Sequence, residues 1–167
     1  MLALGVLLLG HGTYDVYYKP SVRLDRTIKR WLERHYWTVN PESDVPSDKF
    51  YFAIWARDQA DRRIMISREK DSKGILGFAA PIDLDDDTIR KIGEKLSPVE
   101  QQQIYEELHI LLASMHLGYN SEIFTNMAVE HALPIDDHLT EHMVDLKAKE
   151  VVDGVIVARS MVRRAVL

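Results

Sequence analysis

The amino-acid sequence predicts an α+β fold in which helices pack on an antiparallel β-meander. Three strand-like runs follow one another in the middle of the chain, and the links between them are short and polar. A parallel crossover needs a dozen or more residues, so links this short favour antiparallel pairing. Amphipathic patterns of helical period flank this region on both sides. The resulting order is α-β-β-β-α-α-β-α, which is typical of the α+β class.

The first half of the chain contains one expected helix and the three strands. The helix is expected over residues 21–34, where Ser21 is a suitable N-cap and apolar residues recur every three or four positions. The strands are expected at 49–57, 62–69 and 73–82, which are rich in β-forming residues. The polar links DQAD and KDSK between them are typical of hairpin connections.

Two local signals predict a pair of helices after the strands. The acidic run at 83–87 places negative charge beside the positive end of a helix dipole. Ser97 and Glu100 form a capping-box pattern, with a proline at the first helical position. A second helix of the pair is therefore expected over 98–115, and Gly118 is expected to close it.

The last part of the chain predicts one or two strands at 122–135, followed by a long helix. Asp136 or Asp137 is expected to cap this helix, which would reach the C-terminus. Its apolar stripe has regular spacing and consists of Val144, Ala148, Val151, Val155, Ala158, Val162 and Ala165. Because further apolar residues widen this stripe, we expect the helix to cover a sheet and also to meet a partner.

Length and composition predict a single soluble domain at 21–167, preceded by an apolar arm or edge strand at 1–20. The 167 residues fit one domain of ~100–200 residues. The chain has no cysteine, which excludes disulfides and thiol catalysis and suits a reducing cytoplasm. The opening apolar run lacks the flanks of a signal peptide and is shorter than the ~20 residues that span a bilayer. The net charge of −5 argues against a nucleic-acid partner.

Two short motifs indicate possible chemistry. Gly-His-Gly-Thr at 10–13 resembles the entry of the small cobalt and iron chelatases, but the hairpins expected later do not suit their parallel sheet. The sequence HLTEH spells His-x-x-Glu-His, and on a helix His138 and His142 would share a face and could ligate Zn²⁺, with Glu141 as general base. Surface or capping histidines, and adventitious zinc or nickel binding, are the alternatives.

The order and character of the elements resemble the type III secretion chaperone-like fold, and within it an uncharacterised archaeal branch. The segments that carry this resemblance are SVRLDRTIKRWLERHYW, the meander from KFYFAIWAR to KGILGFAAPIDL, SPVEQQQIYEELHILLASM, and MAVEHALPIDDHLTEHMV. The resemblance implies a small acidic protein that dimerises and binds peptide segments of other proteins along its sheet and helices. It implies no catalytic residue and no cofactor.

The expected function is therefore that of a non-enzymatic cytoplasmic homodimer that binds a protein or peptide partner. Val151, Val155 and Val162 of the last helix and Trp55 of the first strand are the expected contact residues. The alternative is a metal-dependent enzyme or metal-binding protein that uses His138 and His142. A pocket for a small ligand between sheet and helix is a third hypothesis.

Overall fold

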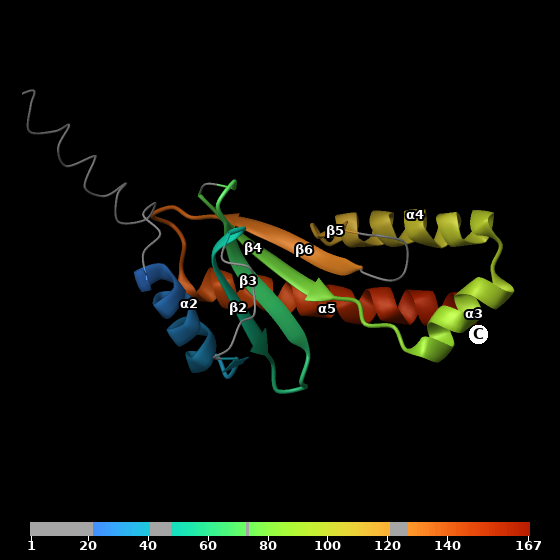
Figure 1. The fold of residues 1–167 in the computed structure, drawn as a ribbon, viewed down its shortest axis with the longest axis horizontal. Helices are drawn as coiled ribbons and strands as arrows, with labels where there is room; N and C mark the ends of the chain where they lie inside the picture. Colours follow the sequence, from blue (N-terminus) through green and yellow to red (C-terminus); the bar gives the residue numbers. More distant parts are fainter. Residues whose placement is uncertain (1–21, 41–47, 73, 121–126) are drawn as a thin grey trace, which may run out of the picture. The chain divides into compact units, whose positions relative to one another are not determined.

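The computed structural model describes residues 22–40, 48–72, 74–120 and 127–167 (Figure 1). The expected arm at 1–20, with its Gly-His-Gly-Thr motif, and the expected cap Ser21 lie outside these ranges. The described residues form four helices and six strands, and the fold is α+β as predicted. In chain order the elements are α2 (Val22–Arg34), β1 (Thr38–Val39), β2 (Phe50–Arg57), β3 (Arg63–Glu69), β4 (Ile75–Pro81), α3 (Asp86–Lys95), α4 (Pro98–Ser114), β5 (Gly118–Asn120), β6 (Ala128–Pro134) and α5 (Glu141–Ala165).

Across the described ranges, the strands form one open antiparallel sheet in the order β1-β2-β3-β4-β6-β5. The predicted meander is present, because β2, β3 and β4 are neighbours both in sequence and in the sheet. β6 then pairs with β4 after a long connection through the two middle helices. Hydrogen bonds at the two ends of this pair define its direction: Ile82 N donates to Met127 O at 2.8 Å, and Ile135 N donates to Gly74 O at 2.7 Å. The pairing is antiparallel, because residue numbers rise along one strand as they fall along the other.

The described residues divide into two compact units. The first contains the residues up to Asp61, 65–77 and 132–145. In this unit α2 packs against β1 and β2. Its buried apolar side chains include Ile28, Leu32, Trp37, Ile54, Ile66, Leu76 and Val144.

The second unit contains residues 62–64, 78–131 and 146–167. In this unit α4 packs against β5, and the greater part of α5 supplies the core. Its buried apolar side chains include Leu108, Leu112, Val129, Val151, Val155, Ala158 and Val162. The description of residues 21–167 as a single domain stays a prediction.

The predicted starts of the two middle helices are confirmed. The Asp85 carboxylate caps α3 by accepting a hydrogen bond from Thr88 N at 2.8 Å. The capping box of α4 is complete, because Ser97 Oγ accepts from Glu100 N and the Glu100 carboxylate accepts from Ser97 N at 2.7 Å. These contacts satisfy backbone donors that have no partner within the first turn of a helix.

The predicted start of the last helix is wrong by several residues. Asp136 does not cap α5, because its carboxylate accepts from His138 N at 2.8 Å in a local turn. Thr140 caps the helix instead, since its Oγ1 accepts from Met143 N at 3.3 Å. Aspartate and threonine side chains can both accept hydrogen bonds from nearby backbone N–H groups. Here the Asp136 carboxylate accepts such a bond within the turn before the helix, so it is not available as the helix cap. The helix therefore begins at Glu141 and leaves His138 outside it.

The predicted closure of α4 by Gly118 is also wrong. His116 adopts a left-handed backbone conformation with φ of 58°, the conformation that commonly ends helices. Leu117 N then donates to Leu112 O at 2.9 Å, which satisfies one of the last helical carbonyls. Gly118 instead opens β5, a three-residue strand that, like β1, was too short for its pattern to predict.

Gly154 in α5 permits a close contact within the second unit. A Cβ atom at this position would lie 2.6 Å from Leu117 Cδ1 and 3.1 Å from Val129 Cγ1. Since distances below 3.0 Å require neighbouring atoms to move, the absence of a side chain at Gly154 lets α5 approach this part of the core closely. None of the helices in the described ranges combines the length and apolar character needed to cross a bilayer.

Candidate functional site

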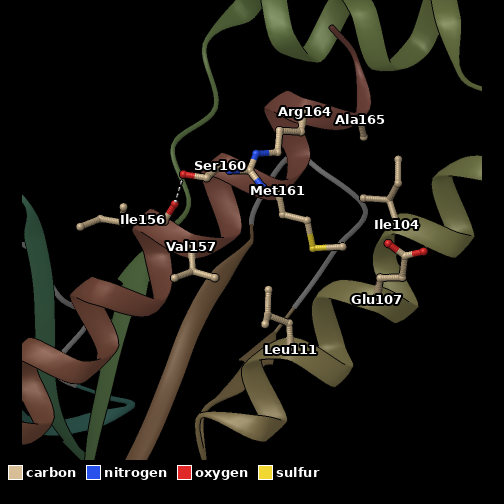
Figure 2. A pocket seen from close by; sticks show the side chains of 9 residues that line it. All are labelled: Ile104, Glu107, Leu111, Ile156, Val157, Ser160, Met161, Arg164 and Ala165. Carbon is tan, nitrogen blue, oxygen red and sulfur yellow. Dashed lines mark hydrogen bonds between the residues drawn. The ribbon is translucent and has the colours of Figure 1, made fainter.

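A groove of about 550 Å³ lies between α4 and α5 in the second unit (Figure 2). Its lining comes from three residues of α4 and six of α5. They are Ile104, Glu107 and Leu111, and Ile156, Val157, Ser160, Met161, Arg164 and Ala165. A volume of this size falls within the range of roughly 300–1,000 Å³ that is usual for ligand pockets. We call it the α4–α5 groove.

The floor of the α4–α5 groove is apolar. Ile104 and Leu111 contribute from α4, and Val157 and Met161 contribute from α5. Figure 2 shows the Met161 side chain extending from α5 into the space between the two helices. Ile156, at the edge of the groove, is 44% exposed. Exposed apolar surface that lines a concave site indicates binding of an apolar partner surface.

The two walls of the α4–α5 groove carry opposite charge. α4 contains three acidic residues, Glu100, Glu106 and Glu107, and no lysine or arginine. The α5 segment from Ile156 to Ala165 contains three arginines, Arg159, Arg163 and Arg164, and no acidic residue. We therefore call α4 the acidic wall and this part of α5 the basic wall; of these charges, Glu107 and Arg164 are the two that line the groove itself.

Two of these charges have neither an ion pair nor a side-chain hydrogen bond among the described residues: Glu107 on the acidic wall and Arg164 on the basic wall. On the basic wall, Arg159 Nη2 lies 3.6 Å from the Asp83 carboxylate, and Arg163 Nη2 lies 2.9 Å from the Asp85 carboxylate. On the acidic wall, the Glu100 carboxylate belongs to the capping box, and the Glu106 carboxylate accepts from the Gln102 side chain at 3.1 Å. Glu107 and Arg164 both line the groove and are exposed.

The lining of the α4–α5 groove suits binding rather than catalysis. Ser160 is the only hydroxyl-bearing residue among the nine lining residues, and its Oγ donates to Ile156 O at 2.8 Å. That hydrogen bond stays within one turn of α5, and no histidine among the lining residues faces the hydroxyl to activate it. The arrangement offers apolar contact and two charges of opposite sign.

Three of the four predicted contact residues are buried within the chain, and contact of the four with a partner stays a prediction. Val151 and Val162 are 0% exposed and Val155 is 6% exposed, so all three belong to the core and present almost no surface to a partner. Trp55 is half-buried on β2 between the buried residues Ile54 and Ala56, and alternation along the strand places it on the opposite face. The exposed apolar surface of α5 lies on a neighbouring side of the helix.

The HLTEH segment does not form the helical arrangement on which the metal hypothesis depended. His138 lies in the turn before α5, whereas His142 lies in the first turn of the helix, and both are exposed. The Glu141 carboxylate, the expected general base, is engaged by Arg34 Nη2 at 2.7 Å and by His35 Nε2 at 3.2 Å. The described residues contain no group of three or more His, Cys, Asp or Glu side chains arranged to hold a metal ion. Metal binding by His138 and His142 stays a prediction.

A second polar cluster lies in the first unit and joins α2 and its following turn to the start of α5. His35 Nδ1 lies 3.2 Å from one oxygen of the buried Asp145 carboxylate, and Trp37 Nε1 donates to the other oxygen at 3.0 Å. Arg34 and His35 both contact Glu141. We call Arg34, His35, Trp37, Glu141 and Asp145 the α2–α5 clamp. Its polar side chains are satisfied by one another, which indicates a structural role.

His131 forms a separate contact in the second unit. Its Nδ1 lies 3.0 Å from the backbone oxygen of His116, so the neutral ring carries its proton on Nδ1 and donates it there. Burial, together with the charge of nearby Lys147, lowers the pKa of His131 below its ordinary value. His131 is thus a neutral, oriented imidazole at neutral pH, as expected for a histidine at the edge of the core.

Sequence analysis did not identify the α4–α5 groove, although two signals of it are present. One is the segregation of charge, with acids alone on α4 and arginines alone at the end of α5. The other is the presence of apolar residues on more than one face of α4, where Ile110 is 68% exposed. Neither signal shows that these two helices line a common groove.

Comparison with solved structures shows a protein of similar fold. No family model and no curated protein sequence matches this chain. A solved structure of an uncharacterized protein from Methanothermobacter thermautotrophicus is similar, with a TM-score of 0.72 at 14% sequence identity, over 85% of this chain and 98% of that chain. At this identity the likeness shows the fold alone. The similar protein is archaeal and uncharacterised, which agrees with that part of the resemblance drawn from the sequence.

Proposed function

We propose that this chain is a non-enzymatic, chaperone-like binding protein whose α4–α5 groove receives an amphipathic helix of a protein partner. The observation that carries the proposal is the apolar floor between an acid, Glu107, and a base, Arg164, neither of which has a partner in the part of the chain that the structure describes. The resemblance to the type III secretion chaperone-like fold supports the same class of function, and with it a cytoplasmic homodimer. The α+β fold with helices and an antiparallel sheet is compatible with that class.

The shape of the groove defines the partner segment. Its α4 wall runs from Ile104 to Leu111, which are seven positions apart, or about 10 Å along the helix. Two turns of a partner helix have this length and present apolar side chains at positions i, i+3, i+4 and i+7. Insertion of one or two of these side chains between Ile104, Leu111 and Met161 would remove apolar surface of both molecules from water.

The charges of Glu107 and Arg164 define which charged residues should flank the apolar stripe of the partner helix. Facing Glu107, the partner helix should carry a lysine or arginine, and facing Arg164 it should carry an acidic residue. Fully burying one leucine side chain contributes about 1.5–3 kcal/mol, while association and ordering of side chains cost a large part of the gain. We therefore expect a short helical peptide to bind with a dissociation constant of roughly micromolar size.

Two designed helical peptides test the proposal. Both carry the same leucine stripe, and they differ only in whether their flanking charges match or oppose Glu107 and Arg164. Fluorescence anisotropy should show that the matched peptide binds at least about tenfold more tightly than the opposed one, because like charges placed together are unfavourable. The difference should shrink as salt is raised.

A substitution in the floor completes this test. Met161→Lys places a charge in the apolar floor and should abolish binding of the matched peptide. Ala113→Lys adds the same charge at an exposed position of α4 that does not line the groove, and it should leave binding unchanged. The proposal is wrong if both peptides bind equally to the wild type, or if Met161→Lys and Ala113→Lys bind the matched peptide equally well.

A further inference from the structure

We infer that the helical surface that fills the α4–α5 groove is supplied by a second copy of this chain, so that two α4–α5 pairs meet about a twofold axis. This inference rests on the proposed function, because it uses the same groove and names its occupant. The partner required by the groove must present apolar residues between a base and an acid. The chain itself carries this combination, in Ile156 and Met161 flanked by Arg164 and Glu107.

A twofold contact requires that the surface be complementary to itself. Rotation about such an axis places the basic wall of one copy against the acidic wall of the other. Arg164 of one copy then faces Glu107 of the second, and the reciprocal pair forms at the same time. Glu107 and Arg164, which have neither an ion pair nor a side-chain hydrogen bond among the described residues, thereby acquire one partner each.

The apolar residues of the groove fit the same arrangement. Ile156 is 44% exposed at the groove edge, and Met161 extends into the space between the helices (Figure 2). In the twofold contact Ile156 faces the α4 wall of the second copy, and Met161, which extends between the helices, approaches its own counterpart near the axis. Methionine adapts its shape readily, so two Met161 side chains can fill one irregular gap. A closed dimer covers both grooves together and leaves no groove open for a chain of further copies.

The charges that line the groove also distinguish between two alignments of the copies. Among the nine lining residues, Glu107 is the charged residue of α4 and Arg164 is the charged residue of α5. The opposite alignment, α4 against α4 and α5 against α5, would place like charges together. The wall charges therefore favour one alignment of the two copies over the other.

Charge reversal measured by sedimentation equilibrium tests the inference. Glu107→Arg and Arg164→Glu should each raise the dissociation constant of the dimer at least about tenfold, because each creates two like-charge contacts per dimer. The double variant Glu107→Arg/Arg164→Glu restores opposite charges across the axis and should return the constant to within about threefold of the wild type. Glu106→Arg is the matched control: it makes the same charge change on α4 at a residue that does not line the groove.

Titration of the matched peptide in parallel distinguishes failure of this inference from failure of the proposed function. Restoration in the double variant, with unchanged circular dichroism of all variants, supports the inference. A monomeric wild type, or a dimer insensitive to both single reversals, overturns it. If that protein still binds the matched peptide, the proposed function stands and only the identity of the occupant is wrong. If it binds neither a second copy nor the peptide, both the inference and the proposed function fail.

Discussion

The two ends of α5 differ in how their polar groups are used. At the first turn, Glu141 and Asp145 accept contacts from Arg34, His35 and Trp37 within the α2–α5 clamp. At the last turns, Arg164 has no ion-pair partner among the described residues and lies beside an open apolar floor. The polar groups at the first end therefore have partners within the chain, whereas the second end presents a charge and apolar surface to solvent.

This difference separates stability from association along a single helix. Polar groups that are paired within the chain contribute to the free energy of unfolding, and breaking a buried pair leaves a costly unsatisfied group. Unpaired surface charges beside exposed apolar groups contribute little until a partner is present. Substitutions at the first end should therefore lower stability, and substitutions at the second end should weaken association.

The largest effect is expected from Asp145→Ala. This change leaves Trp37 Nε1 and His35 Nδ1 without their carboxylate in a buried site, so the free energy of unfolding should fall by about 3 kcal/mol. Urea unfolding followed by circular dichroism measures the loss. Asp153→Ala, which removes only an exposed ion pair with Arg62, should cost less than about 1 kcal/mol. Equal losses for the two variants would show that the clamp is not a stabilising unit.

A smaller effect is expected from His35→Gln. The ring of His35 contacts both Glu141 and Asp145 at 3.2 Å, but it is one-third exposed, so its removal should lower the free energy of unfolding by about 1 kcal/mol. His138→Gln is the matched control, because His138 is exposed and precedes the helix. It should change stability by less than about 0.5 kcal/mol. A loss at His138 that matches the loss at His35 would contradict the assignment of the clamp.

How far the sequence predicts the fold depends on how near in sequence each interacting partner lies. The caps at Asp85 and Ser97 are predictable because their partners lie three residues away in the chain. The prediction that Asp136 or Asp137 caps the last helix is wrong, because Thr140 is the residue that accepts from a first-turn backbone donor, and the local pattern does not distinguish these candidates. The strands β1 and β5 are too short for a periodic pattern.

The sites were less predictable than the fold. Trp37 and Asp145 are 108 residues apart in sequence, and no local pattern connects them. The α4–α5 groove depends on which helices are neighbours, which the pattern of each helix alone does not show. The same limitation applies to Val151, Val155 and Val162. Their helical spacing predicts an apolar face of the last helix, but it does not show whether that face packs against the rest of the chain or against a partner.

The free energy of unfolding is expected to depend weakly on pH through the exposed contact between Arg163, at the basic end of α5, and Asp85. Hydrogen bonds from the backbone and side chain of Thr88, and then the contact with Arg163, lower the pKa of Asp85 from 3.8 to about 2. Because the folded-state pKa is lower than the unfolded one, this contribution to stability is complete above about pH 4 and is lost as the pH falls toward 2.

Asp85→Asn isolates that contribution. Asparagine retains a capping oxygen but cannot ionise, so the variant should lose less stability than the wild type between pH 5 and pH 2. Urea midpoints at both pH values measure the difference. An identical pH dependence of the two proteins would show that Asp85 does not contribute to it.

The smallest effect on stability is expected from Met161→Lys, although it should abolish association. Met161 is partly exposed in the groove floor, so the free energy of unfolding should change by less than about 0.5 kcal/mol. Thermal unfolding of a dilute sample measures stability apart from association. A loss of about 2 kcal/mol would show instead that the groove floor belongs to the core, and the contrast between the two ends of α5 would disappear.

Gly154 has a consequence for how this chain and its relatives can diverge. With Leu117 Cδ1 at 2.6 Å and Val129 Cγ1 at 3.1 Å from any added Cβ, a larger residue at 154 requires a smaller one opposite. Homologous sequences should therefore show linked substitution of positions 154, 117 and 129, with their combined side-chain volume held nearly constant. Such covariation would mark the relatives that keep this close approach of α5 to the core.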